Sequence, residues 1–193
     1  MGRYVNPGNQ AFRRIAGPDY VDKTGLISLM NSRVGGDDCL VCVCRPRRFG
    51  KSYAVKMLTA YYDGSCDSHN LFNRRIISKT ESYEEHINKY NVICLDISGF
   101  ISYARREKIK LSDVPSIIAS SIKKEIVAMD SEAPEEKSLE DCLIHCAERS
   151  DGKPFVFIID EWDALIREAK DDEKAQTAYL NLLRGWFKDT TFT

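Results

Sequence analysis

The chain has 193 residues, of which 43% are hydrophobic and 30% charged, values typical of a globular domain with its own core. The formal net charge of −1 argues against a strongly basic nucleic-acid-binding protein, because affinity for DNA depends mainly on neutralising phosphates. No stretch approaches the roughly 20 apolar residues of a transmembrane helix, and the N-terminus lacks the apolar segment of a signal peptide. We therefore expect a cytoplasmic protein whose seven cysteines are thiols.

The composition of the N-terminal part predicts an arm ahead of a domain. Residues 1–19 are polar and contain several glycines and prolines, so we expect them to be irregular, with the domain covering residues 20–193. The expected apolar anchors of the arm are Phe12 and Ile15. Apolar residues then recur at helical spacing over 26–30, and either Asp22 or Thr24 can cap that predicted helix.

The most informative stretch follows a glycine-containing turn at 34–38. Residues 39–44, CLVCVC, form a short apolar run that predicts a buried strand. A proline, a glycine and three arginines interrupt the apolar pattern over 45–50, and helical spacing begins at residue 54. The sequence Gly50-Lys51-Ser52 therefore stands between a predicted strand and a predicted helix, which is the context of a phosphate-binding loop.

Such a loop binds phosphate mainly through its backbone. The first N–H groups of a helix have no partner within the helix, and the helix dipole adds partial positive charge there. Lys51 would then reach the β- and γ-phosphates, and the Ser52 hydroxyl would bind Mg²⁺. An ordinary surface turn is the alternative, because Arg45 stands where the usual motif has glycine and Gly-Lys-Ser is short enough to occur by chance.

Further strands and helices are predicted downstream. The apolar run at 92–97 predicts a strand buried on both faces, as in a parallel sheet, and a basic loop is expected over 99–110. An apolar stripe over 114–129 predicts a long helix with Ser112 as its N-cap. Other helical segments are expected within 70–90, from a capping box at 138 to about 149, and after 173.

A third apolar strand, 155–159, ends in paired carboxylates. Asp160, Glu161 and Asp163 follow it, with Trp162 among them. Ligands of α/β sheets bind at the carboxyl ends of strands, where Asp160 can hold Mg²⁺ through its water shell. Glu161 can orient the water that attacks the γ-phosphate, a step that depends on positioning and electrostatics. The alternative is that these residues only begin the next helix, where carboxylates are favoured.

The order of these segments predicts the fold class. Strands that alternate with helices indicate an α/β fold with parallel, right-handed βαβ units. Between Lys51 and Asp160 lie a whole predicted strand and two helices, which suits the P-loop folds that insert a strand between the two motif strands and carry a catalytic glutamate. We therefore expect a P-loop NTPase with three α/β/α layers and a mainly parallel sheet.

These motifs resemble those of a known family, the predicted AAA-ATPase-like proteins. The resemblance is carried by Tyr-Val-Asp-Lys-Thr at 20–24, Arg-Pro-Arg-Arg-Phe-Gly-Lys-Ser at 45–52 and Asp-Glu-Trp-Asp at 160–163. Trp162 stands where the family has tyrosine, and Arg45 in place of the first glycine is similar to the family's own version of the loop. The likeness extends over nearly the whole chain.

The resemblance implies ATP and Mg²⁺ as ligands. It implies that Lys51 and Glu161 are catalytic and that Ser52 and Asp160 bind the metal. The nucleotide-binding residues that it implies are Tyr20, Asp22, Lys23, Arg47, Arg48, Phe49, Gly50, Lys51, Ser52 and Tyr53. For the first three the alternative is a helix cap, and for the two arginines it is ordinary solvation on the loop.

Relatives in this family often continue into further strands, a helical lid and a nuclease-like C-terminal domain. The resemblance therefore implies that these 193 residues are the N-terminal part of a larger protein, truncated after the acidic strand and its helix. The sheet of such a fragment would have an incompletely paired edge. A structure in which the two motif strands pair directly with each other would contradict this expectation.

Three functions are compatible with these patterns. The first is Mg-dependent ATP hydrolysis that acts as a switch for a protein partner or for a C-terminal nuclease-like domain. The second is a nucleotide sensor or scaffold that binds ATP without turnover. The third is a nucleic-acid-handling module, which the arginines at 45–48 and 105–106 suggest and the nearly neutral net charge opposes. No membrane partner is expected.

Overall fold

The computed structural model describes residues 2–44, 49–149 and 153–187, and the chain divides into two compact units. The first unit contains Met1–Cys94 and Lys153–Ile158. The second contains Leu95–Gly152 and Ile159–Phe192. Each unit is a substructure with its own core, and the assignment of residues 20–193 to one ATPase domain stays a prediction.

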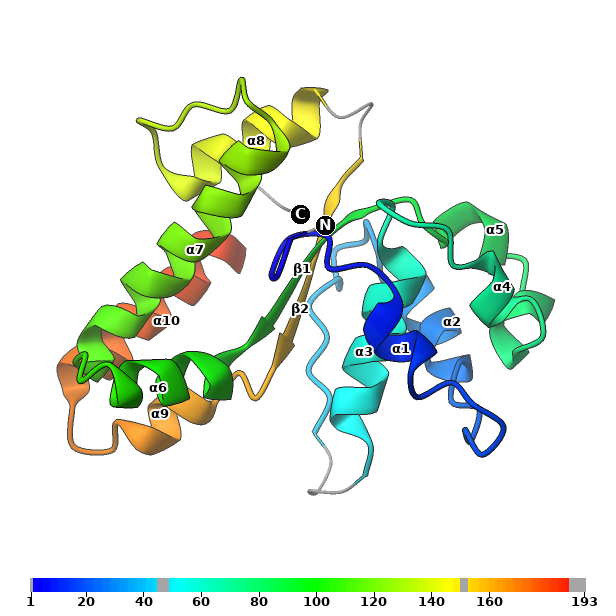
Figure 1. The fold of residues 1–193 in the computed structure, drawn as a ribbon, viewed down its shortest axis with the longest axis horizontal. Coiled ribbons are helices and arrows are strands. Elements are labelled where there is room, and N and C mark those ends of the chain that lie inside the picture. Colours follow the sequence, from blue (N-terminus) through cyan, green and yellow to red (C-terminus); the bar gives the residue numbers. More distant parts are fainter. Residues whose placement is uncertain (1, 45–48, 150–152, 188–193) are drawn as a thin grey trace. The chain divides into compact units, whose positions relative to one another are not determined.

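Both strands predicted in the downstream half of the chain are present. Strands β1 (Asn91–Asp96) and β2 (Phe155–Asp160) pair in parallel as a two-stranded sheet (Figure 1). Val92, Ile93 and Leu95 are fully buried, in agreement with the continuous apolar run of β1. The mixed α/β class and the parallel pairing are thereby confirmed.

Residues near the N-terminus pair with β1 and are more regular than the arm that composition predicts. The amide of Asn6 donates to the Val92 carbonyl at 2.7 Å, and the Asn6 side chain accepts the Val92 amide at 2.7 Å. The Cys94 amide donates to the Tyr4 carbonyl at 2.8 Å, which completes a short antiparallel pairing. The N-terminal segment is therefore fastened to the sheet by main-chain hydrogen bonds.

The first unit is built on an aromatic core around helix α3. Its helical segments are α1 (Gln10–Arg13), α2 (Gly25–Asn31), α3 (Lys51–Tyr62), α4 (His69–Phe72), η1 (Ile76–Lys79) and α5 (Tyr83–His86). Phe12 of α1 is fully buried, as predicted for an anchor, and its ring stacks on Phe72 at 5.2 Å between centroids. Tyr61 meets Phe72 edge to face at 5.4 Å, and Tyr62 meets Tyr90 in the same way at 5.3 Å.

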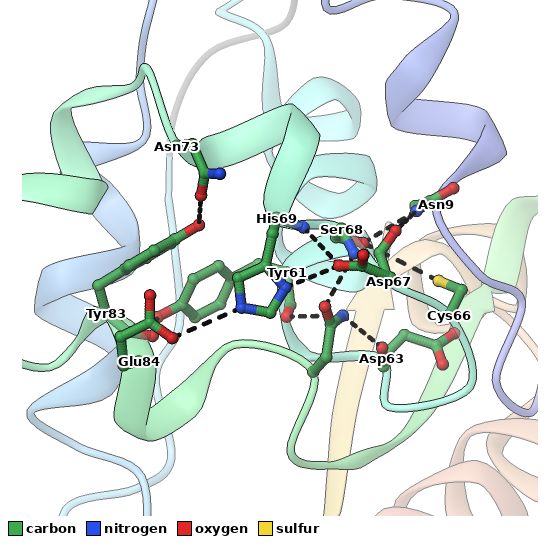
Figure 2. A network of polar contacts seen from close by, with 11 residues as sticks. Asn9, Tyr61, Asp63, Cys66, Asp67, Ser68, His69, Asn73, Tyr83 and Glu84 are labelled. Carbon is green, nitrogen blue, oxygen red and sulfur yellow. Dashed lines mark hydrogen bonds and ion pairs between the residues drawn. The ribbon is translucent and has the colours of Figure 1, made fainter.

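The chain leaves α3 through a polar network (Figure 2). The buried carboxylate of Asp63 accepts the amides of Gly8 and Ser65, at 2.6 and 2.8 Å. Asn88, whose φ of 57° is left-handed, donates to the Asp63 carbonyl at 2.6 Å and accepts the Ser68 amide at 2.9 Å. The network thus satisfies buried backbone groups at the turn and joins it to the N-terminal segment.

The same network joins α4 to α5 through an exposed histidine. His69 Nδ1 lies 2.7 Å from Asp67 Oδ1, and His69 Nε2 lies 3.5 Å from Glu84 (Figure 2). Tyr83 meets the His69 ring edge to face and donates its hydroxyl to Asn73 Oδ1 at 2.8 Å. These contacts connect the short helices α4 and α5 of the first unit.

The second unit is helical. Its helices are α6 (Ile97–Arg106), η2 (Leu111–Asp113), α7 (Val114–Met129), α8 (Leu139–Arg149), α9 (Ala164–Glu168) and α10 (Glu173–Phe187). Helix α7 contacts α8 and α10, and α6 contacts α9 (Figure 1). Ile118, Ile122 and Ile126 of α7 are fully buried, which confirms the predicted apolar stripe. None of the described helices is both long enough and apolar enough to span a bilayer.

Two predictions about helix ends in this unit need correction. A basic loop is expected over 99–110, but most of this segment belongs to helix α6. The helix forms because Phe100, Ile101 and Ala104 give it a buried face. The Asp96 side chain caps α6 by accepting the amide of Gly99 at 3.3 Å, so this glycine does not break the helix. Helix α7 has Asp113 as its N-cap, after the turn η2, in place of the predicted Ser112.

The predicted strand at 39–44 is absent, so this prediction is wrong. The stretch belongs to no β-ladder of the described residues, and its apolar side chains are exposed, with Leu40 at 62% and Val43 at 47%. A strand forms only where a neighbouring strand accepts and donates its backbone hydrogen bonds. In the described part of the chain this stretch has no such neighbour, whereas β1 and β2 have each other.

We predict that Asn88→Ala lowers the free energy of unfolding by about 2–3 kcal/mol, because it removes three side-chain hydrogen bonds and leaves alanine in a left-handed conformation. Asn88→Gly, which loses the same bonds without that conformational penalty, should be about 1 kcal/mol less destabilising. Denaturation in urea followed by circular dichroism measures both.

Lys108→Ala provides the control, since Lys108 also has a positive φ, 57°, and is exposed. It should change stability little. Equal losses for the alanine and glycine variants of Asn88 would show that its backbone conformation carries no cost.

Candidate functional site

The sequence Gly50-Lys51-Ser52 begins helix α3, as predicted. Gly50 is the N-cap residue and has φ 83°, in the left-handed region, so a side chain there would be strained. A Cβ atom at Gly50 would also lie 3.3 Å from Lys23 Nζ. Lys51 and Ser52 are the first two helical residues, and their N-cap residue, a glycine, has no side chain with which to cap the helix. The helix therefore presents backbone N–H groups at the position where the motif requires them.

Lys23 lies against this loop. Its ammonium group donates to the Phe49 carbonyl at 3.4 Å and approaches Gly50. The segment at 20–24, which lies outside the motif, therefore contacts the loop at the start of α3. Lys23 adds positive charge at the place where Lys51 begins the helix, and this charge favours an anionic ligand.

Tyr20 and Asp22 are engaged in contacts of the fold. The Tyr20 hydroxyl contacts Met57 Sδ at 3.3 Å, and the Arg75 guanidinium lies 4.8 Å from the centre of the Tyr20 ring. Burial raises the pKa of Tyr20. Asp22 accepts the amide and hydroxyl of Thr24, at 2.9 and 2.7 Å, and the Ile76 amide at 2.9 Å. Thr24 occupies the N-cap position of α2, but no side chain makes a cap hydrogen bond there. The bonds of Asp22 instead join Thr24 to the start of η1, and a nucleotide-binding role for Tyr20 or Asp22 stays a prediction.

Two aromatic residues flank the motif on the surface. Phe49 is 62% exposed and Tyr53 is 51% exposed, with Lys56 Nζ 5.5 Å from the centre of the Tyr53 ring. Their rings are accessible to a ligand that reaches the start of α3. Arg47 and Arg48, also predicted to contact nucleotide, lie outside the described residues.

The acidic motif stands at the carboxyl end of β2. Asp160 is the last residue of the strand, and its Oδ1 atom accepts the amide of Glu161 at 3.1 Å. Glu161 has φ 51°, an uncommon conformation for a residue other than glycine, and the chain turns there before α9. The Trp162 carbonyl accepts a hydrogen bond from the Tyr179 hydroxyl at 2.7 Å.

An arginine that sequence reasoning missed binds two of these carboxylates. Arg167 Nη2 donates to Glu161 Oε2 at 2.9 Å, and Arg167 Nη1 donates to Asp163 Oδ2 at 2.5 Å. The bonds to Asp163 and Glu161 raise the pKa of Arg167 further above its ordinary value. Asp163 and Arg167 are four residues apart at the start of α9, a spacing that the sequence displays. The contact with Glu161 depends on the turn and is not visible in the spacing.

The donor set suits Mg²⁺ bound with a nucleotide. Magnesium usually takes one or two protein oxygens plus phosphates and water, and it does not need a cage of protein ligands. Asp160 Oδ2, which accepts no hydrogen bond from the described residues, can serve as one such oxygen. Within residues 2–44, 49–149 and 153–187 no cluster of three or more acidic, histidine or cysteine side chains could hold a metal. That Ser52 and Asp160 share one ion stays a prediction.

We predict that the cost of Asp22→Asn depends on pH. Burial tends to raise the pKa of Asp22, but the hydrogen bonds from Thr24 and Ile76 outweigh it, so the pKa lies below its ordinary value of 3.8. A carboxylate with a lowered pKa stabilises the fold above the unfolded-state pKa and loses this effect as pH falls through the folded-state value. The stability gap between wild type and variant should therefore be constant above about pH 5 and shrink as the pH falls through 3.8 towards the lower folded-state value.

Denaturant unfolding at several pH values measures this gap. Asp19→Asn serves as the control, since Asp19 is exposed and receives no hydrogen bond from the described residues. Its gap should be small at every pH. A gap for Asp22→Asn that is independent of pH would contradict the role of these bonds.

Comparison with known proteins identifies the family. No curated protein and no solved structure matches the chain. The model of one family, described as Predicted AAA-ATPase, matches residues 7–191. Both the Gly50-Lys51-Ser52 motif at the start of α3 and the acidic motif at the end of β2 lie within the matched range. Because the match covers nearly all of its length, the chain belongs to the predicted AAA-ATPase family.

Proposed function

We propose that this protein binds ATP with Mg²⁺ and hydrolyses it. The observation that carries the proposal is Gly50 in a left-handed conformation at the start of α3, directly before Lys51 and Ser52. Membership in a family of predicted ATPases supports the same activity. Hydrolysis would act as a switch for a protein partner or for a C-terminal nuclease-like domain.

The start of α3 would bind the phosphates. Backbone N–H groups there donate to phosphate oxygens, and Lys51 neutralises the β- and γ-phosphates. The Ser52 hydroxyl would hold the metal together with Asp160. When bound, Mg²⁺ neutralises charge that develops on the phosphates during transfer.

Glu161 would orient the attacking water. Phosphoryl transfer requires positioning and electrostatic stabilisation more than a strong base, so a carboxylate beside the metal is sufficient. Glu161 directly follows Asp160 at the end of a strand, the part of an α/β sheet where ligands bind. The two carboxylates thus divide the metal-binding and water-orienting roles.

Residues around the loop would contact the rest of the nucleotide. Lys23 is supported by its hydrogen bond to the Phe49 carbonyl, and the exposed rings of Phe49 and Tyr53 are suited to contact the base or ribose. The proposal also includes Tyr20, Asp22, Arg47, Arg48 and Gly50. A three-layer P-loop fold with a mainly parallel sheet belongs to the same proposal, which the parallel pairing of β1 and β2 supports.

We predict that Mg-ATP raises the thermal stability of the wild type and not that of Lys51→Ala. A ligand at about 100 times its dissociation constant stabilises the folded state by about 2.7 kcal/mol. Lys56→Ala is a matched control, because Lys56 lies on the same helix beyond the phosphate-binding end. Differential scanning fluorimetry with and without nucleotide measures the shift, and a shift that survives in Lys51→Ala would count against this phosphate site.

We also predict that Glu161→Gln reduces ATP hydrolysis by about a hundredfold or more, because it removes the group that orients water. Nucleotide binding should persist. Glu168→Gln controls for loss of an exposed carboxylate, since Glu168 pairs with Arg105 and lies outside the proposed machinery. Phosphate release measures turnover. A wild type that binds nucleotide and releases no phosphate would instead identify a nucleotide sensor.

A further inference from the structure

Arg167 forms a fork between Glu161 and Asp163 in the second unit. Its two terminal nitrogens donate to different carboxylates, at 2.9 Å to Glu161 Oε2 and 2.5 Å to Asp163 Oδ2. A guanidinium group is planar and rigid, so two such bonds orient it between the two carboxylates. The contact is therefore more specific than an ordinary pairing of opposite charges.

The local backbone explains why Arg167 reaches Glu161. Asp163 is the N-cap residue of α9, and the Arg167 amide donates to the Asp163 carbonyl at 3.1 Å, so their side chains lie one helical turn apart. Glu161 precedes this turn and adopts φ 51°. The turn at Glu161 allows its side chain to reach the same guanidinium group that binds Asp163.

The fork uses one carboxylate oxygen of Glu161. Glu161 Oε2 accepts the bond from Arg167, whereas Oε1 accepts none from the described residues. A glutamate side chain has three rotatable bonds, and an anchor at one oxygen restricts them while the other oxygen can still accept a hydrogen bond from water. This arrangement suits a group that must present an oxygen to water in a fixed direction.

We propose that Arg167 is a positioning residue for ATP hydrolysis, which holds Glu161 so that its second oxygen orients the attacking water. The inference rests on the proposed function, in which Glu161 has that role. Arg167 and both carboxylates are partly exposed to solvent, and exposed ion pairs contribute little to stability. Loss of the fork should therefore affect turnover much more than folding.

The experiment compares steady-state ATP hydrolysis by wild type, Arg167→Gln and Arg167→Lys. We expect Arg167→Gln to reduce kcat about tenfold with an unchanged KM for ATP, because misplacement of a catalytic group slows the chemical step without weakening binding. Arg167→Lys keeps the charge but not the fork, so its kcat should lie between the other two. All variants should unfold at the wild-type temperature.

Arg105→Gln is the matched control. It removes another exposed arginine–glutamate contact of the same unit, between Arg105 and Glu168, which lies outside the acidic motif. Its kcat and KM should equal those of the wild type. An equal loss of kcat in Arg105→Gln would overturn the proposal, because the effect would then follow from removal of any surface arginine.

The double variant Glu161→Gln/Arg167→Gln tests whether Arg167 acts through Glu161. If it does, the double variant should be no slower than Glu161→Gln alone. Additive losses, or an Arg167→Gln variant with wild-type or higher kcat, would overturn the positioning role while leaving hydrolysis intact. A wild type that binds ATP and releases no phosphate would overturn the proposed function itself, and the role of Arg167 with it.

Discussion

The burial of the C-terminal half of α3 in an aromatic core is the constraint on which the candidate phosphate-binding end depends. Tyr61 and Tyr62 are almost completely buried, and Met57 one turn earlier is fully buried. A helix is stiff over its length, so contacts that fix one end also direct the other. The polar network around Asp63 then closes the turn after Tyr62. The start of α3 is therefore positioned mainly by the buried end of the same helix.

The two motifs are supported in different ways. At α3, a helix of 12 residues supplies the amides, and Lys23 approaches from a separate segment. At β2, the strand ends in Asp160, and the carboxylates are arranged by a turn and by one arginine. The first half is a property of regular backbone, whereas the second depends on side-chain contacts. The effects of single substitutions should therefore differ more from residue to residue at the acidic motif than at the start of α3.

The elements that could be predicted from sequence are those whose pattern has only one good explanation. Strands β1 and β2 are mainly apolar and each ends in an aspartate, and α7 has an apolar stripe at helical spacing. The run at 39–44 is at least as apolar as β1, yet it forms no strand because pairing depends on a neighbour that composition does not specify. The sequence does not predict helix α6, because Gly99 in its first turn is a residue typical of loops.

The same distinction applies to the site. Gly50, Lys51 and Ser52 were recognisable because the motif requires contiguous residues at the start of a helix. Arg167 was not, because its contact with Glu161 depends on a positive φ at a residue that rarely adopts one. Local sequence therefore predicts where a helix begins better than it predicts how a carboxylate is held.

The pairing of the N-terminal segment with β1 has a consequence for the order of folding. Asn6 and Val92 are 86 positions apart, so the segment leaves the ribosome long before its partner has been made. Contacts of such long sequence separation form slowly, because the entropy of closing the intervening loop is lost before they are gained. The helices of the first unit, whose contacts with one another span shorter stretches of the chain, should form ahead of this pairing. The segment that comes first in the chain should therefore be among the last to reach its native position.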